Sequence, residues 1–153
     1  GMFEHVGKKF YNIFFKSINN LLKDDGLFLL HTIGVVDKPT PPNKFINKYI
    51  FPGGTCPSLS QIVKPIEKTG LIVADTETLI RHYDKTLMSW LNRFMAKRDL
   101  VKDMFDEKFV KMWSFYLASC ASAFRYRDLV VFQLQIVKNF DTAHSTRDYI
   151  YNP

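Results

Sequence analysis

The chain has 153 residues, about the length of one domain, and a globular chain of this length buries roughly 70% of its unfolded surface, so one core can form without disulfides. Hydrophobic residues make up 46% of the sequence, yet no apolar run reaches the ~20 residues that a membrane span requires, and no secretory leader opens the chain. The formal charge of +6 favours an anionic partner without deciding between nucleic acid, a substrate phosphate and membrane headgroups.

The first predicted elements are a helix and a strand. Apolar residues recur at near-helical spacing over residues 8–23, and the sequence Asp-Asp-Gly that follows is typical of a turn. Residues 27–33 are predicted to form a strand, and because its first four residues are all apolar, we expect both of its faces to be covered. His31 follows this apolar run, so we predict an imidazole at the end of a buried strand, where a crevice would begin.

Residues 35–57 are predicted to form an irregular excursion, the kind of long connection that often carries a binding function. The excursion contains five of the seven prolines, namely Pro39, Pro41, Pro42, Pro52 and Pro57. Ser58 and Gln61 then have the spacing of a capping box, which indicates the start of a helix. Pro65 should kink or shorten that helix, and Gly70 should end it.

The second half of the chain is predicted to contain two more strands and two helices. Residues 71–78 form the first of these strands. Apolar residues at i, i+4, i+7, i+8 and i+11 from Tyr83 predict a helix whose apolar face carries the tyrosine, and the same period over residues 109–124 predicts a longer helix. Phe132, Leu134 and Ile136 alternate with Gln133 and Gln135, which is typical of a strand with one drier face. We therefore expect one helix-rich α/β unit with a parallel or mixed sheet, followed by a polar, loosely held tail over residues 139–153.

The residues that could carry chemistry are few. Glu4, His31 and Tyr83 each have a structural interpretation, as a solvated carboxylate near the chain start, a hydrogen-bonded histidine and a core tyrosine with a satisfied hydroxyl. Cys56 and Cys120 form neither a C-x-x-C pair nor a zinc-like spacing, so we interpret both as reduced thiols and predict no metal site.

Several segments together are similar to a known family. They are "GMFEHVG", "LFLLHTIG", "FINKYIFPGG", "PSLSQI", "HYDKTLMSWLNRF" and "MWSFYLASCASAFRYRDLVVFQL". In this order they resemble the C-terminal half of the cyclopropane fatty acid synthases and their mycolic acid cyclopropane synthase relatives, in register from Gly1 to about Lys138. The resemblance implies that residues 1–138 are the C-terminal portion of a class I S-adenosylmethionine-dependent methyltransferase of Rossmann-like fold. The three predicted strands would be the last three of its sheet, and residues 129–137 would run antiparallel.

The resemblance also implies a reaction. These enzymes transfer a methyl group from S-adenosylmethionine to a cis double bond of a phospholipid acyl chain and then remove a proton, so that the carbocation closes into a ring. The family's base is a bound bicarbonate ion, which by resemblance is held by Glu4, His31, the backbone at Ile33 and the hydroxyl of Tyr83. A further cysteine of the family has no counterpart here. An anion in an apolar site serves as a fixed base and stabilises a cation, and the bicarbonate O–H would point at the Glu4 carboxylate. His5, His82 and Cys56 are not expected to belong to this site.

One part of the family pattern is missing. The chain has no G-x-G-x-G loop after a strand and no acidic residue placed to hold the cofactor ribose, so its cofactor-binding residues are unknown and we expect the fragment alone to be inactive. A sheet lacking four strands exposes an apolar edge, which favours a homodimer or pairing with the missing N-terminal half. By resemblance the partners are phospholipid acyl chains and not nucleic acid, and the location is cytoplasmic, peripheral at the inner membrane surface.

Two alternatives and one local question stay open. The chain could be a noncatalytic module that binds lipid or protein, from a truncated or split gene, or it could belong to a lipid methyltransferase that makes methyl-branched or hydroxylated products. The apolar residues of the excursion either line the acyl pocket, as the resemblance implies, or fold back on the chain's own core. These residues are Phe45, Ile46, Tyr49, Ile50 and Phe51.

Overall fold

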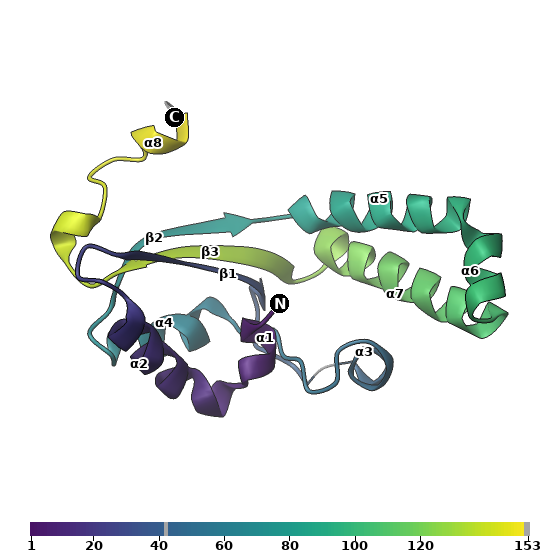
Figure 1. The fold of residues 1–153 in the computed structure, drawn as a ribbon, viewed down its shortest axis with the longest axis horizontal. Coiled ribbons are helices and arrows are strands. Elements are labelled where there is room, and N and C mark those ends of the chain that lie inside the picture. The colour runs from purple at the N-terminus through teal and green to yellow at the C-terminus, as the bar shows by residue number, and fades with distance from the viewer. Residues whose placement is uncertain (42, 152–153) are drawn as a thin grey trace.

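The computed structural model describes residues 1–41 and 43–151, so Pro42, one of the prolines of the predicted excursion, lies outside the described residues. Figure 1 shows a sheet with helices against it and a helical arm that extends away from the sheet. The elements in chain order are α1 (Phe3–Val6), the 3-10 helix η1 (Lys8–Phe10), α2 (Tyr11–Leu21), β1 (Leu27–Val35), α3 (Lys44–Tyr49), α4 (Leu59–Glu67), β2 (Ile72–Leu79), α5 (His82–Ala96), α6 (Arg98–Met104), α7 (Glu107–Tyr126), β3 (Leu129–Val137), the 3-10 helix η2 (Phe140–Thr142) and α8 (Asp148–Tyr151).

The three strands form one sheet in the order β1-β3-β2, so the last strand of the sequence lies between the two earlier ones. β3 is antiparallel to both neighbours, and β1 and β2 therefore run parallel to each other without pairing. The expectation of a parallel or mixed sheet is wrong for these three strands, because β3 lies between the two parallel strands and separates them. The three predicted strands are confirmed, and β1 continues beyond its predicted end to Val35. The antiparallel direction that the family resemblance implies for the last strand is confirmed as well.

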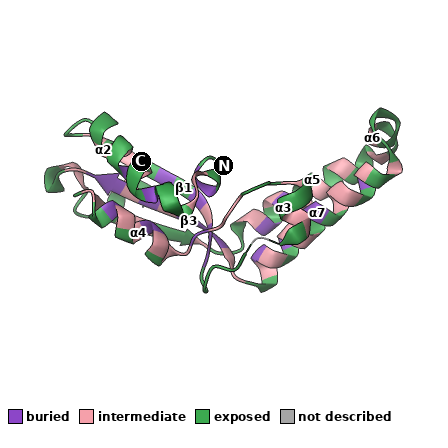
Figure 2. Ribbon diagram, turned by 90° about the horizontal axis from the view of Figure 1, so that it is seen from below, coloured by how far each residue is buried: buried purple, intermediate pink, exposed green. Residues whose placement is uncertain are grey.

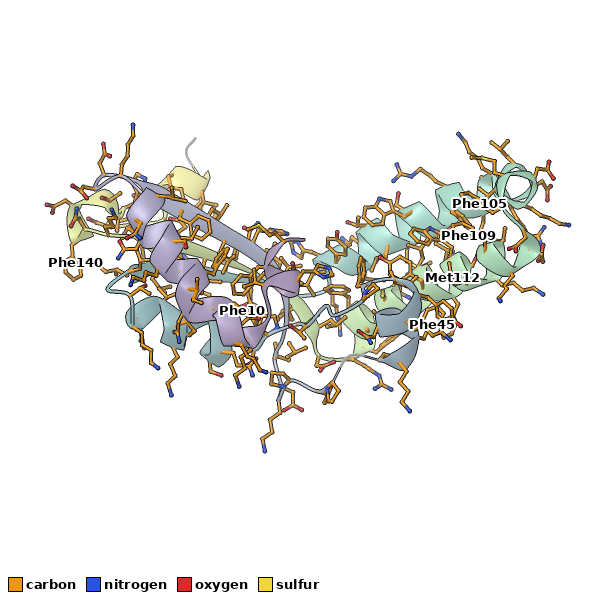
Figure 3. The ribbon with its side chains drawn as sticks, turned by 60° about the horizontal axis from the view of Figure 1, so that its bottom comes forward. Phe10, Phe45, Phe105, Phe109, Met112 and Phe140 are labelled. Carbon is orange, nitrogen blue, oxygen red and sulfur yellow. The ribbon has the colours of Figure 1, made fainter. Side chains whose placement is uncertain are left out.

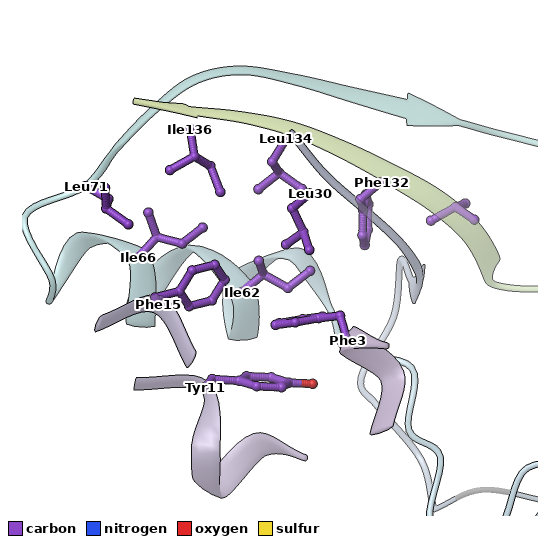
Figure 4. Packing of buried hydrophobic residues seen from close by; sticks show 11 residues of the cluster. Phe3, Tyr11, Phe15, Leu30, Ile62, Ile66, Leu71, Phe132, Leu134 and Ile136 are labelled. Atoms are coloured by element: carbon purple, nitrogen blue, oxygen red, sulfur yellow. The ribbon is translucent and has the colours of Figure 1, made fainter. Parts of the chain in front are cut away.

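One face of the sheet is covered by α2 and α4, and the first core lies in this layer. Phe15 of α2, together with Ile62 and Ile66 of α4, is fully buried in the same cluster as Leu134 and Ile136 of β3. Figure 4 shows these side chains pointing into the space between the strands and the helices. Because side chains alternate along a strand, the glutamines of β3 point to the opposite face.

The opposite face is covered by helices at one end only, where Ile33 of β1 and Val131 of β3 pack with α5 and α7. Leu27 and Leu29 of β1 point to this side and are 43% and 50% exposed. The prediction that both faces of this strand are covered is therefore wrong at its N-terminal end. The physical reason is that a continuous apolar run is buried on both faces only where helices flank the sheet on both sides, whereas residues 1–41 and 43–151 place α2 and α4 on the same side.

The segment after β3 lies across this open face. Arg147 forms an ion pair with Asp75 of β2. The Tyr149 hydroxyl accepts a hydrogen bond of 2.6 Å from Gln135 Nε2 and donates one of 3.2 Å to Asp75 Oδ2. These contacts hold the described part of the tail, residues 139–151, against the sheet, so the prediction of a loosely held tail is wrong at Arg147 and Tyr149.

The arm consists of α5 and α7, which lie side by side, and α6, which joins them at the tip (Figure 1). Leu87, Leu117 and Ala121 are buried in the second core, which the two helices share with β3. Asp84 at the start of α5 accepts two hydrogen bonds, of 2.8 and 2.9 Å, from Arg125 at the end of α7. Figure 2 shows buried residues along α5 and α7 and exposed ones around α6. The two long helices are confirmed, and α6 is an addition.

Local sequence features also appear as expected. The predicted capping box is present, since Ser58 N donates to Gln61 Oε1 at 3.3 Å and α4 begins at the next residue. Pro65 lies within α4, and Gly70 takes a positive φ of 77° after the helix has ended. The excursion contains α3, whose first turn is capped by the Asn43 side chain accepting from Phe45 N at 2.8 Å.

Candidate functional site

Glu4 is bound to the outer edge of β1. It comes from α1 and is 9% exposed. Its Oε1 accepts hydrogen bonds from Thr32 Oγ1 at 2.9 Å and from Ile33 N at 2.7 Å. The Ile33 N–H donates to a side chain and is therefore not one of the backbone hydrogen bonds between strands. Among the described strands, β1 pairs only with β3. The Ile33 amide therefore points away from β3, and Glu4 occupies the position that a neighbouring strand would take.

The neighbours of Glu4 fix this position. Phe3 is buried and stacks on Tyr11, with ring centroids 4.5 Å apart. On the other side, the Glu4 carbonyl accepts a hydrogen bond of 2.9 Å from Thr55 N. Gly34 adds a close approach, because a Cβ at this residue would lie 2.6 Å from the Pro57 carbonyl and would overlap the Phe132 ring. α1, β1 and the excursion thus meet around the carboxylate.

The second carboxylate oxygen of Glu4 differs from the first. Oε2 is buried and accepts no hydrogen bond within the described residues, although the ammonium group of Gly1 forms an ion pair with it at 3.0 Å. Burial raises the pKa of the carboxyl group, but the hydrogen bonds that it accepts, first from Ile33 N–H, outweigh burial and hold the pKa below its ordinary value. Glu4 is therefore an ionised carboxylate whose two oxygens have different partners, since Thr32 and the Ile33 amide bind Oε1 and the Gly1 ammonium lies beside Oε2.

His31 does not lie at the end of a strand. β1 continues through it to Val35, so the prediction of a terminal imidazole is wrong, and its side chain is exposed. His31 Nδ1 lies 3.0 Å from Gln133 Nε2, in the adjacent strand at the paired position. An amide nitrogen can only donate, so Nδ1 accepts and Nε2 carries the proton in this arrangement. Because neighbouring residues of a strand point to opposite faces, His31 faces away from Thr32 and its partner Glu4.

Tyr83 lies in the second core at the start of α5. Its ring packs on Phe124 and on Trp90, with centroid distances of 5.3 and 6.0 Å. Ile33 packs against the same cluster. Next to the tyrosine, Asp84 is 8% exposed and forms the ion pair with Arg125 described above. This pair holds the first turn of α5, and with it Tyr83, against the end of α7.

The predicted site residues meet around Ile33. Its backbone amide binds Glu4, its side chain shares a cluster with Tyr83, and His31 lies two positions earlier on the same face of β1. Within residues 1–41 and 43–151 no hydrogen bond joins Glu4 to His31 or to Tyr83. The assignment of Glu4, His31, Ile33 and Tyr83 to one anion site stays a prediction.

Sequence reasoning missed three participants. Thr32 is fully buried and binds Glu4, Gln133 binds His31, and Asp84 fixes the helix that carries Tyr83. A threonine next to His31 in the first strand and a glutamine in an apolar strand were visible in the sequence. Their partners were not, because each contact joins residues far apart in the chain.

The two cysteines are free thiols. Burial raises the pKa of Cys56 to about 11 and also raises the pKa of Cys120. Both are therefore protonated near neutral pH. The described residues contain no group of three or more His, Cys, Asp or Glu side chains that could hold a metal ion.

Comparison with known proteins places this arrangement in a family. Residues 1–134 match the mycolic acid cyclopropane synthetase family. The cyclopropane-fatty-acyl-phospholipid synthase of Escherichia coli strain K12 is 42% identical over 134 residues, which cover 88% of this chain and 35% of that enzyme. The chain thus spans about a third of the length of this curated relative.

Solved structures agree with that match. The cyclopropane synthase MmaA2 from Mycobacterium tuberculosis superposes with a TM-score of 0.82 at 29% identity, over 89% of this chain and 52% of the other. The mycolic acid cyclopropane synthase CmaA1, solved in complex with SAH and CTAB, gives a TM-score of 0.81 at 32% identity over the same shares. The expected α/β fold of the C-terminal part of such a methyltransferase is confirmed. The chain belongs to the mycolic acid cyclopropane synthetase family.

Proposed function

We propose that this chain is the C-terminal part of an S-adenosylmethionine-dependent lipid methyltransferase, which converts cis double bonds of phospholipid acyl chains to cyclopropanes. The observation that carries the proposal is the buried, ionised carboxylate of Glu4, which lies at the edge of the strand that bears His31 and beside the apolar cluster of Tyr83. A fixed negative group beside apolar side chains suits a reaction through a cation that water would quench.

The residues of this chain do not fit S-adenosylmethionine. In the described residues no strand leads into a glycine-rich loop, and Gly34 is packed against Pro57 and Phe132, where no ligand can approach. S-adenosylmethionine, when bound to a complete enzyme, supplies the methyl group. We therefore assign the cofactor to the missing N-terminal half and expect the 153-residue chain alone to turn over no lipid.

Bicarbonate fits the chain in part. It has one O–H, and Glu4 Oε2 is a buried acceptor to which that O–H could donate in place of the Gly1 ammonium, which lies 3.0 Å away. His31 and Tyr83 can donate to an anion, whereas the Ile33 amide already donates to Glu4 Oε1. Bicarbonate, when bound, would supply the base of the reaction. In our proposal Glu4 orients that anion, His31 and Tyr83 bind it, and Ile33 positions Glu4.

The excursion contributes apolar surface near the proposed site. Phe45 packs edge-on against Phe115 of α7 at a centroid distance of 4.9 Å, and Phe51 packs likewise against Tyr116 at 5.9 Å. The excursion thus folds back on the second core, one of the two interpretations that the sequence left open. Phe45, Ile46 and Ile50 pack against the same cluster as Tyr83. Because this apolar neighbourhood suits an acyl chain, we retain the acyl pocket as part of the proposal.

We also propose that the enzyme acts at the inner membrane surface from the cytoplasmic side. No helix in the described part of the chain is both long and apolar enough to cross a bilayer. Phospholipid acyl chains would then have to be reached from the surface. The net positive charge of +6 suits an anionic lipid surface.

The proposal is tested by supplying the chain together with an N-terminal half from a relative and measuring phospholipid masses. We expect acyl chains to gain one methylene and to lose the double bond. Glu4→Gln, His31→Gln and Tyr83→Phe should each lower the yield at least ~10²-fold, as for loss of an acid–base or charge-stabilising group. His5→Gln and His82→Gln serve as matched controls and should keep it.

The same measurement separates the alternatives. Methyl-branched or hydroxylated products would indicate a related lipid methyltransferase with the same site. The N-terminal half should first be shown to be active with its own C-terminal half. If that half then gives no product with this chain, the result contradicts the enzymatic proposal and favours the noncatalytic module, a class that also suits the absence of a glycine-rich loop from the described residues.

A further inference from the structure

The tip of the helical arm exposes large apolar side chains. We define the arm tip as residues 95–111, which include α6 and the first turn of α7. Leu100, Met104 and Phe105 are 58%, 66% and 60% exposed. Leu100 and Met104 are four residues apart in α6 and therefore share one face of that helix, and Phe105 follows directly. Figure 3 shows Phe105 at the far end of the arm.

The tip is held in this shape by specific contacts. Arg98 donates two hydrogen bonds, of 2.6 and 2.8 Å, to the Glu107 carboxylate and so ties α6 to α7. Asp106 caps α7 by accepting from Phe109 N at 2.6 Å. The Phe105 ring is stacked on Phe109, with centroids 4.3 Å apart. The apolar surface is therefore preorganised, and little conformational entropy is lost when it is covered.

Basic residues surround this apolar surface. Six Lys or Arg and four Asp or Glu lie between residues 93 and 111. Three of the acidic residues are engaged locally, Glu107 and Asp99 with Arg98 and Asp106 as the cap. Lys97, Lys108 and Lys111 are exposed and form no ion pair within the described residues. A surplus of positive charge around protruding apolar side chains is complementary to an anionic, partly apolar surface.

We propose that the arm tip docks on the surface of an anionic phospholipid bilayer. Leu100, Met104 and Phe105 enter the boundary between headgroups and acyl chains, and Lys97, Lys108 and Lys111 contact the phosphates. This inference deepens the proposed function, because it names the surface through which the chain reaches its lipid. A second copy of the chain and the missing N-terminal half are rival occupants that the experiment separates.

An aromatic series supports this choice over the rivals. From Phe105 the rings of Phe109, Trp113 and Tyr116 follow one another along α7, and Phe51 packs on the last of them. The centroid distances are 4.3, 5.9, 5.0 and 5.9 Å. α7 has 20 residues, which corresponds to about 30 Å of helix. The exposed tip is thus joined by continuous apolar side chains to the cluster that contains Tyr83, as a lipid-facing surface requires.

The experiment measures cosedimentation of the full 153-residue chain with vesicles of equal parts phosphatidylglycerol and phosphatidylcholine. The triple variant Leu100→Ser, Met104→Ser, Phe105→Ser should bind about tenfold more weakly than the wild type, because three apolar side chains no longer enter the interface. The matched control Ile13→Ser, Leu21→Ser, Phe140→Ser removes apolar residues that are 63%, 81% and 82% exposed but lie outside the arm, and it should bind like the wild type.

A second pair of variants tests the charge. Lys97→Gln, Lys108→Gln, Lys111→Gln should weaken binding and flatten its dependence on salt, whereas Lys8→Gln, Lys9→Gln, Lys68→Gln should change it less. Circular dichroism of each variant confirms that it is folded. Absence of wild-type binding at low salt, or an equal loss for tip and control variants, would overturn the proposal.

The rival occupants give other results. If the tip contacts a second copy, the apolar tip variant changes the sedimentation coefficient and leaves vesicle binding intact, which rejects lipid docking. If the tip contacts the N-terminal half, adding that half releases the wild type from vesicles, and this result also rejects lipid docking. The vesicle assay needs no methyl transfer. Tip-dependent binding without lipid modification would therefore reject the proposed function and leave the docking proposal standing.

Discussion

The carboxylate of Glu4 accepts a 2.7 Å hydrogen bond from the backbone N–H of Ile33, a residue 29 positions later in the chain. This contact joins the first helix to the free edge of β1. It also explains why an acidic side chain is tolerated at 9% exposure, because the buried charge receives a backbone and a hydroxyl hydrogen bond on one oxygen.

Glu4→Gln should make the stability less dependent on pH. The folded state holds the pKa of Glu4 below its ordinary value, so the carboxylate stabilises the fold fully above the unfolded pKa, about 4.3. That stabilisation is lost as pH falls through the folded pKa. Urea unfolding should show the variant about 1–3 kcal/mol less stable than the wild type at neutral pH. The difference should shrink below about pH 4, and a constant difference across this range would contradict the assignment.

Gly34→Ala should destabilise the chain strongly. The added Cβ would lie 2.6 Å from the Pro57 carbonyl and would overlap the Phe132 ring, both of which are held in the core. Overpacking of this kind costs about 1–3 kcal/mol, and more where backbone must move. Thermal unfolding checks this, with Leu27→Ala at the other end of β1 as a control that should cost less because Leu27 is 43% exposed. Equal melting temperatures for Gly34→Ala and the wild type would be inconsistent with the close approach.

Asp84→Asn should lower the melting temperature by several degrees. The change removes the charge that accepts two hydrogen bonds from Arg125, and it loosens the start of α5 from the end of α7. Asp103→Asn, on the exposed arm tip, is the matched control and should have little effect. If the site proposal is right, Asp84→Asn should also reduce lipid modification in the complemented enzyme, because Tyr83 is then less firmly placed.

Cys56 should be nearly inert towards iodoacetamide at pH 8 in the folded chain. Burial raises its pKa to about 11, so the thiolate is on the order of one part in 10³ at that pH, against roughly a quarter for an unperturbed thiol. A Cys120→Ser background isolates the single cysteine. The alkylation rate should rise at least ~100-fold in denaturing urea, and similar rates in the two conditions would refute the buried thiol.

Sequence patterns predicted the local elements well. The three strands, the capping box of Ser58 and Gln61 and the two arm helices all depend on periodicity or on neighbouring residues, which a sequence displays directly. The strand order was a different matter. The family resemblance implied that the last strand runs antiparallel, but that β3 lies between β1 and β2 was not predicted, since an alternating pattern says nothing about which strands a segment joins.

The site was only partly predictable. Glu4 binds the Ile33 amide and Tyr83 packs in the same cluster as Ile33, whereas the predicted end of the strand at His31 is wrong because β1 continues to Val35. Alternation along the predicted strand already places His31 and Thr32 on opposite faces, but the sequence does not show which of these faces Glu4 meets. The prediction that Leu27 and Leu29 are covered failed for another reason, since the described residues place α2 and α4 on the opposite face from these two side chains.

The central place of β3 has a consequence for how this polypeptide matures on the ribosome. β1 and β2 are synthesised early, yet each finds its hydrogen-bonding neighbour only in residues 129–137. Residues up to 137 must leave the exit tunnel before β3 can form hydrogen bonds with β1 or β2. Pairings between such distant segments form slowly. A nascent chain halted before residue 129 would therefore contain two unpaired, aggregation-prone strand segments, and we expect chaperones to bind such a chain.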